Sequence, residues 1–200
     1  MGKMGSLEKL FVNSPGHSRR VAEHAAKMLE WVELEPGQKY LDLGCGNGMA
    51  PIHVGRRFGL AVTGVDVDSA QIRQARESAK DLQGARFVTV DGTHLPFQDG
   101  EFHIVATNKV THHIPQWEDA LEEMIRVSRP GGFFIYNDIV YPRLVAAVGR
   151  MVAGKRAGFP TTRELEAFVD RNRLSKLHLS RSPVHYEAVC RLPVTMQTPG

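Results

Sequence analysis

The amino-acid sequence predicts an α/β fold, namely a doubly wound, mostly parallel seven-stranded sheet with helices on both faces and an antiparallel C-terminal hairpin. Short apolar runs alternate with segments of helical periodicity between residues 39 and 137. Continuous apolar strands separated by helices are typical of a parallel sheet covered on both faces. Near the end of the chain, two further strand-like runs are joined by a turn so short that they must be antiparallel.

The individual elements follow from local patterns. A helix is expected from Ser18, as its N-cap, to about Leu34, because apolar positions recur at helical spacing. Strands are expected over residues 39–43, 60–65, 85–90, 102–107 and 133–137, and helices around 51–58, over 69–81 and over 117–127, with a turn at 129–132. The last part should contain helices over 143–154 and 161–172, followed by hairpin strands over 174–180 and 184–192.

Composition limits the classes of protein. Two hundred residues, 42% of them hydrophobic, form one core without requiring a second domain. The net charge of +3 comes from scattered basic residues, so a nucleic-acid partner is an alternative that we do not favour. Two distant cysteines indicate a reducing compartment, and no stretch suits a membrane span or signal peptide. We expect a cytoplasmic protein; the sequence leaves open its oligomeric state and whether residues 1–6 are native.

A glycine-rich loop connects the first strand to a helix, in the segment Asp42-Leu43-Gly44-Cys45-Gly46-Asn47-Gly48. Glycines lack a Cβ, so the backbone can approach a ligand closely, and ligands of open α/β sheets bind at the carboxyl ends of the strands. The dinucleotide fingerprint G-x-G-x-x-G is not matched, because Met49 stands where the third glycine is required. This departure weakens the case for NAD, although the glycines alone do not decide between nucleotide cofactors.

Carboxylates follow the next two strands. Asp66 ends the second strand and can accept hydrogen bonds from two ribose hydroxyls, and Asp91 follows the third strand and can accept one from an adenine amine. Asp68 is expected to begin the following turn or helix instead of binding a ligand. The pattern suits an adenosine-containing ligand.

In order and spacing, these motifs resemble class I S-adenosylmethionine-dependent methyltransferases, and the resemblance covers residues 38–192. It implies S-adenosylmethionine as cofactor and S-adenosylhomocysteine as product. The implied cofactor contacts are Asp42, Gly44, Cys45, Gly46, Asp66, Val67, Asp91, Gly92 and the backbone of Asn108. By the same resemblance, Asp42 orients the cofactor's amino group, Asp66 binds the ribose, and Val67 contacts the adenine face. The single domain, 1–200, then divides into a helical cap (1–36), a cofactor-binding core (37–138), a helical substrate-side insert (139–173) and the closing hairpin (174–192).

Two adjacent histidines, His112 and His113, follow the fourth strand and are the candidate catalytic residues, as general bases. Neighbouring side chains of an extended or helical segment point in different directions, so we expect at most one to reach the pocket. The alternative is that one packs under the loop through a backbone hydrogen bond while the other is solvated.

A metal site is not expected. Asn137 and Asp138 end the fifth strand and, with Asn108, are similar in position to the metal ligands of catechol-type O-methyltransferases. The neutral Asn108 stands where those enzymes need a carboxylate, which a hard cation prefers. Asp138 is therefore expected to line the acceptor pocket or to cap the next helix.

Other side chains are assigned to the cofactor or to the acceptor. Arg19 or Arg20 could pair with the methionine carboxylate, although solvent exposure is the alternative for each. Four apolar residues are expected either to form a lid over the acceptor or to pack in the core, namely Phe11, Tyr141, Met151 and Phe159.

The sequence favours a methyltransferase for a small-molecule acceptor, because the chain is little more than the catalytic core. Methylation of RNA or protein, and a non-catalytic cofactor-binding partner subunit, are the alternatives.

Overall fold

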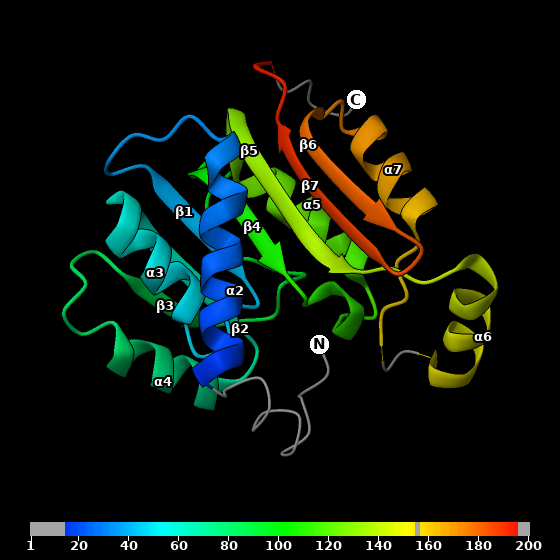
Figure 1. The fold of residues 1–200 in the computed structure, drawn as a ribbon, viewed down its shortest axis with the longest axis horizontal. Coiled ribbons are helices and arrows are strands. Elements are labelled where there is room, and N and C mark those ends of the chain that lie inside the picture. Colours follow the sequence, from blue (N-terminus) through cyan, green and yellow to red (C-terminus); the bar gives the residue numbers. More distant parts are fainter. Residues whose placement is uncertain (1–14, 155–156, 196–200) are drawn as a thin grey trace.

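The computed structural model describes residues 15–154 and 157–195, in which a seven-stranded sheet lies between two layers of helices (Figure 1). The strands are β1 (Lys39–Leu43), β2 (Ala61–Asp66), β3 (Arg86–Thr89), β4 (Phe102–Asn108), β5 (Ser128–Ile139), β6 (Ser175–Ser182) and β7 (His185–Arg191). The α-helices are α2 (Pro15–Met28), α3 (Met49–Phe58), α4 (Ser69–Ser78), α5 (Trp117–Val127), α6 (Arg143–Ala153) and α7 (Thr162–Arg171), and two 3-10 helices are η1 (Leu29–Trp31) and η2 (Thr111–His113).

The strand order is β3-β2-β1-β4-β5-β7-β6. Strands β1 to β5 pair in parallel, whereas β7 is antiparallel to both β5 and β6. The predicted doubly wound sheet and its reversed C-terminal hairpin are therefore confirmed. The order reverses between β1 and β4, and the loops that follow these two strands leave the same edge of the sheet, where open α/β sheets bind ligands.

The core lies on both faces of the sheet. On one face, Ile104 and Ala106 of β4 pack with residues of α2 and α3. On the other face, Val105 packs with residues of α5 and α7. Successive residues of one strand thus serve opposite layers, as the pleat requires.

Two predicted boundaries are wrong in detail. Helix α2 begins at Pro15, so Ser18 lies inside it and is not the N-cap; its buried hydroxyl instead accepts a hydrogen bond from Asn47 Nδ2 at 3.4 Å. The predicted turn at 129–132 belongs to β5, which pairs with β4 across a register shift between Phe102 and Ile104. A local glycine pattern therefore marked a strand irregularity and not the start of the strand.

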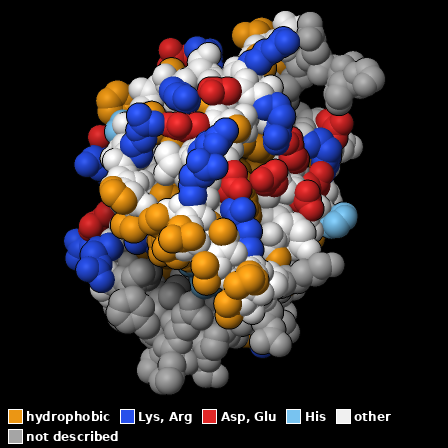
Figure 2. All heavy atoms as spheres, turned by 90° about the vertical axis from the view of Figure 1, so that its right-hand side faces the viewer, with side chains coloured by type: hydrophobic (Ala, Val, Ile, Leu, Met, Phe, Trp, Pro, Cys, Tyr) orange, Lys and Arg blue, Asp and Glu red, His pale blue; other side chains and the backbone are white. Residues whose placement is uncertain are grey.

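Helix α6 contributes little to the core. Ala146 is its buried residue, whereas the exposed side chains include Leu144, Val145, Val148, Met151 and Val152. Figure 2 shows hydrophobic side chains gathered on the face of the molecule that carries this helix. In the described part of the chain, no helix has both the length and the apolar character needed to cross a membrane.

Candidate functional site

The glycine loop follows β1 and is fixed by backbone contacts. Gly44, Gly46 and Gly48 all have positive φ angles, of 78°, 52° and 79°, which favour glycine. A Cβ added to Gly44 would lie 2.3 Å from Val110 Cγ2, so the loop passes directly against the segment after β4. A Cβ on Gly46 would meet no described atom within 4 Å. The loop therefore has one packed side and one open side.

Asp66, at the end of β2, holds the loop in place. Its Oδ2 accepts a hydrogen bond from Gly46 N at 3.0 Å, and its Oδ1 accepts one from Asp68 N at 2.8 Å. A carboxylate oxygen can accept more than one hydrogen bond, so a ligand hydroxyl can still bind. As predicted, Asp68 begins the next helix, because its Oδ1 caps α4 at Ala70 N.

The carboxyl group of Asp42 lies within the sheet and is buried. Burial, and then the charge of Asp66, raises the pKa of Asp42 to about 8. Among residues 15–154 and 157–195, no side chain or backbone group is hydrogen-bonded to this carboxyl. A buried carboxylate without a donor is costly, and a cationic ligand group beside it would restore its charged form.

Cys45 lies inside the loop with a buried thiol. Burial, and then the charges of Asp42 and Asp66, raises the pKa of this thiol well above its usual value. The thiol is thus protonated and contacts Gly46 O at 3.6 Å. These properties suit packing and not nucleophilic catalysis.

The predicted adenine contacts lie beside β2 and β3. Val67 directly follows Asp66 and is half-buried. Asp91 accepts hydrogen bonds at its Oδ1 from the backbone and the hydroxyl of Thr93, at 3.1 and 3.0 Å. A Cβ on Gly92 would lie 3.1 Å from Leu43 Cδ1, so this glycine packs against the end of β1. The structure thus brings the ends of β1, β2 and β3 together.

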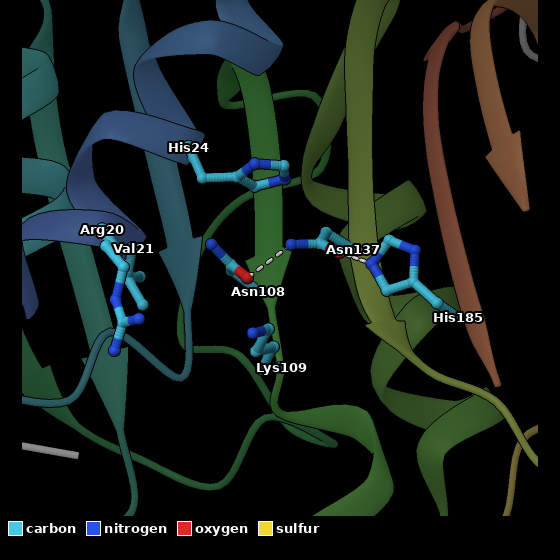
Figure 3. Close-up of a pocket in the computed structure, with 7 residues that line it drawn as sticks. All are labelled: Arg20, Val21, His24, Asn108, Lys109, Asn137 and His185. Carbon is cyan, nitrogen blue, oxygen red and sulfur yellow. Dashed lines mark hydrogen bonds between the residues drawn. The ribbon is translucent and has the colours of Figure 1, made fainter. Parts of the chain in front are cut away.

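A separate cleft opens at the ends of β4, β5 and β7, beneath α2 (Figure 3). Its volume is about 430 Å³, and its lining consists of Arg20, Val21, His24, Asn108, Lys109, Asn137 and His185. The predicted cofactor contact Asn108 lies in it, and Asn137 Nδ2 donates to Asn108 Oδ1 at 2.8 Å. Sequence reasoning missed His24 and His185, because only the packing of α2 and the antiparallel pairing of β7 bring them here.

His112, in η2, is bound to a buried carboxylate. Its Nδ1 lies 2.6 Å from Asp138 Oδ1, and Asp138 is fully buried at the end of β5. Asp138 also accepts hydrogen bonds from the backbone of Val110, His112 and Ile139 and from the hydroxyl of Thr111. Burial raises the pKa of Asp138, but the hydrogen bonds and the charge of His112 outweigh burial and hold it below its usual value.

The predictions for this segment need two corrections. Asp138 neither lines the pocket nor caps the next helix, because its carboxylate is consumed in fixing η2 to β5. His112 and His113 do not diverge: their ring centroids are 3.9 Å apart, with the planes inclined by 44°. A tight 3-10 turn lets the two rings rotate against one another, which spacing alone did not indicate.

The two arginines near the start of the chain have different surroundings. Arg19 forms an exposed ion pair with Glu23 at 2.8 Å, whereas Arg20 lines the cleft.

The predicted apolar lid is not formed as a unit. Met151 is 79% exposed on α6, whereas the rings of Tyr141 and Phe159 pack 5.0 Å apart; Phe11 lies outside the described residues. Within 15–154 and 157–195, no cluster of three or more potential metal ligands occurs.

Comparison with known proteins agrees with this arrangement. Residues 41–136, which span the glycine loop, Asp66, Asp91 and Asn108, match the model of a family described as a methyltransferase domain. The chain belongs to the class I S-adenosylmethionine-dependent methyltransferases. One curated relative is phthiotriol/phenolphthiotriol dimycocerosates methyltransferase 1 of Mycobacterium ulcerans, which is 32% identical over 151 residues (75% of this chain, 55% of the relative). Another is fatty-acid O-methyltransferase of Mycolicibacterium smegmatis, which is 33% identical over 144 residues (67% of this chain, 52% of the relative). The chain thus spans about half the length of these relatives.

Solved structures share the fold at low identity. Geranyl diphosphate C-methyltransferase of Streptomyces coelicolor superposes with a TM-score of 0.72 at 16% identity, over 90% of this chain and 86% of the other. The [4+2]-cyclase SpnF superposes with a TM-score of 0.73 at 19% identity, over 87% and 81%. Because a cyclase shares the fold, the activity of this methyltransferase family member must be argued from its site.

Proposed function

We propose that this chain binds S-adenosylmethionine at the ends of β1, β2 and β3 and transfers its methyl group to a small molecule. The observation that carries this proposal is the buried Asp42 carboxyl at the end of β1, which has no described hydrogen-bond donor and lines a small pocket with Asn108 and Asn137. The cofactor's amino group is a cation that would pair with Asp42. An anionic ligand group would not relieve the cost of burying this carboxylate, whereas a cation would favour its charged form.

The other residues fit the same cofactor. Gly46 leaves room for it, since a Cβ there would meet no described atom, and Asp66 retains acceptor capacity for ribose hydroxyls. Val67 and Asp91 would contact the adenine, with Gly92 beside them, and Gly44 and Cys45 would contribute the loop backbone. When bound, S-adenosylmethionine supplies a methyl group on a positively charged sulfur, which is a good leaving group. The protein then has mainly to position the acceptor.

The class of acceptor is supported by the relatives. Besides the two already described, the family includes curated methyltransferases named for botryococcene and for 2-methyl-6-phytyl-1,4-hydroquinone. All these names denote small molecules with large apolar parts. We propose an acceptor of this kind for the present chain, to which the helical segment around α6 would contribute contacts.

His112 is proposed as the proton acceptor where the methylated atom carries a proton. Its Nδ1 donates to Asp138, which leaves Nε2 as the basic nitrogen. Asp138 is a positioning residue, because it fixes the orientation of the ring and does not contact the acceptor. His113 packs against His112 and would restrict the movement of that ring.

The function is tested by calorimetry of the full chain with S-adenosylmethionine, followed by incubation of metabolite extracts with cofactor labelled in its methyl group. We expect binding to the wild type and at least about ten-fold weaker binding to Asp66→Ala, since charge-assisted hydrogen bonds to the ribose are lost. Absence of binding to the wild type, or equal binding to this variant, would contradict the proposal.

A further inference from the structure

The cleft beneath α2 is lined by hydrogen-bond donors and positive charge. Arg20 and His24 enter from α2, Lys109 follows β4 and His185 begins β7, and no carboxylate belongs to the lining. Figure 3 shows Lys109 below the two asparagines, the His24 ring above them and Arg20 to their left. Among the described residues, neither Arg20 nor Lys109 is in an ion pair. The described part of the chain therefore provides no ion-pair partner for these two basic side chains.

Glu187, an acidic residue near the cleft, already has partners. Glu187 lies on β7 outside the lining, and its two carboxylate oxygens contact His24 Nε2 at 2.7 Å and His178 Nε2 at 2.9 Å. It contacts neither Arg20 nor Lys109. Counted over the described lining, the cleft thus keeps the positive charges of Arg20 and Lys109.

The asparagines present a donor to the cleft because their acceptors are used. His185 Nε2 donates to Asn137 Oδ1 at 2.6 Å, and Asn137 Nδ2 donates to Asn108 Oδ1 at 2.8 Å. Figure 3 shows this relay running from β7 across β5 to β4. The Asn108 amide nitrogen is left to donate to whatever occupies the cleft.

Lys109 is held beside the cleft by an unusual backbone conformation. Its φ of 55° lies in the left-handed region, which is unfavourable for a residue with a side chain, and its N–H donates to Asn137 O at 2.7 Å. Such strain persists where surrounding structure enforces it, and it is common at binding sites. The strand pairing of β4 and β5 thereby fixes the direction in which Lys109 leaves the backbone.

We infer that this cleft binds a carboxylate group of the methyl acceptor. The inference rests on the proposed function and narrows its substrate class to small carboxylic acids. A planar carboxylate fits the fork of Arg20 and can accept further hydrogen bonds from Lys109 and the Asn108 amide. The cleft volume of about 430 Å³ lies within the range of small-molecule sites.

The position of the cleft assigns the carboxylate to the acceptor and not to the cofactor. The residues proposed for the cofactor gather at β1, β2 and β3, whereas the cleft lies at β4, β5 and β7. The two groups adjoin at Asn108, and Asp42 lines a small pocket together with Asn108 and Asn137 of the cleft. An acceptor seated in the cleft would thus adjoin the cofactor from the side of the later strands.

The test is calorimetry of the full chain, saturated with S-adenosylhomocysteine, with octanoate and with octanamide as its uncharged analogue. We expect octanoate to bind at least ten-fold tighter than octanamide. Arg20→Gln and Lys109→Asn should each weaken octanoate about ten-fold or more; asparagine is chosen because it tolerates a left-handed backbone. Arg19→Gln is the matched control, since Arg19 neighbours Arg20 but is paired with Glu23, and it should leave octanoate affinity unchanged.

Asn108→Asp provides an independent variant, because it introduces a negative charge with almost no change of shape. It should abolish octanoate binding, and thermal melting of each variant checks that the protein is folded. Absence of octanoate binding, equal affinity for octanamide, or an equal loss in Arg19→Gln would overturn the inference. If Arg20→Gln weakens S-adenosylhomocysteine by the same factor as octanoate, the carboxylate belongs to the cofactor and the inference is also wrong. Titration of octanoate without S-adenosylhomocysteine tests the cleft separately from the proposed function, which is judged by cofactor binding to the wild type and to Asp66→Ala.

Discussion

Replacing Asp42 by asparagine should stabilise the protein while weakening its cofactor site. The folded-state pKa of about 8 lies above the value of about 3.9 for an unfolded aspartate. Between pH 4 and pH 8, Asp42 is protonated in the folded protein and ionised in the unfolded chain. The stability that this group contributes is therefore greatest below pH 4 and is lost as the pH rises to 8. Asparagine has the same shape and no charge, so Asp42→Asn should avoid this loss.

The size of the effect follows from the same two pKa values. The difference in unfolding free energy between Asp42→Asn and the wild type should grow between pH 5 and pH 8 by on the order of 3 kcal/mol. Urea unfolding of both proteins at the two pH values measures this growth, and comparing two pH values cancels any constant effect of the amide on packing. A difference that stays constant, or that shrinks toward pH 8, would refute the assignment of Asp42 as a buried carboxyl with a raised pKa.

Cofactor binding should also be linked to the protonation of Asp42. Because a cationic amino group pairs only with the ionised carboxylate, binding of S-adenosylmethionine to the wild type should release a proton below pH 8 and tighten as the pH rises toward 8. Calorimetry in buffers of different ionisation enthalpy measures the released proton. Asp42→Asn should bind the cofactor more weakly and release no proton from this site; proton release that persists in the variant would show that another group is responsible.

Further substitutions test the local structure. His112→Ala should lower turnover by about 100-fold or more with little change in cofactor affinity, as measured by steady-state kinetics and calorimetry; unchanged turnover would end the general-base proposal. Asp138→Asn should destabilise the fold by about 2–4 kcal/mol at pH 7, as measured by urea unfolding. The pKa of Asp138 is lowered in the folded state, so the difference in unfolding free energy from the wild type should shrink as the pH falls below about 4. Gly44→Ala should cost more than about 2 kcal/mol of stability, because its Cβ would overlap Val110 at a positive φ. Adding Val110→Ala to this variant should recover part of the loss. An unchanged stability of Gly44→Ala alone would contradict the packing. Thr161→Ala should cost about 1 kcal/mol in thermal or urea unfolding by removing the capping box of α7, in which Thr161 and Glu164 cap one another.

Much of the fold could be predicted because its signals are local. The bounds of β1 and α5 are those expected from periodicity, since a continuous apolar run and an amphipathic period are properties of neighbouring residues. Asp68 was predicted from its place before a helix, where a side-chain oxygen satisfies the first N–H groups. The start of β5 was missed because Gly132 reads as a turn; a Cβ there would lie 2.7 Å from His103 O, and this contact is set by β4.

In the candidate site, too, some features follow from local sequence and others from tertiary packing. The residues of the glycine loop, Asp66 and Asp91 belong to short motifs, so their positions at one sheet edge follow from the order of the strands. The burial of Asp138, and its bond to His112, depends on how η2 folds back on β5, which no local pattern encodes. The roles of these residues, and the division of the chain at residues 36, 138 and 173, stay predictions.

The nearly unburied α6 bears on how this protein can change during evolution. Ala146 is the buried residue of the helix, and substitutions at exposed surface positions usually alter stability by less than about 0.5 kcal/mol. Apart from Gly149, where a Cβ would lie 2.4 Å from Phe159 Cε1, the exposed positions of α6 are therefore under little selection for folding, whereas the glycine loop is constrained by close contacts such as that of Gly44 with Val110. Descendants of one ancestral gene could diversify in this helix, and so in the compounds they contact, while retaining an unchanged methyl-donor site.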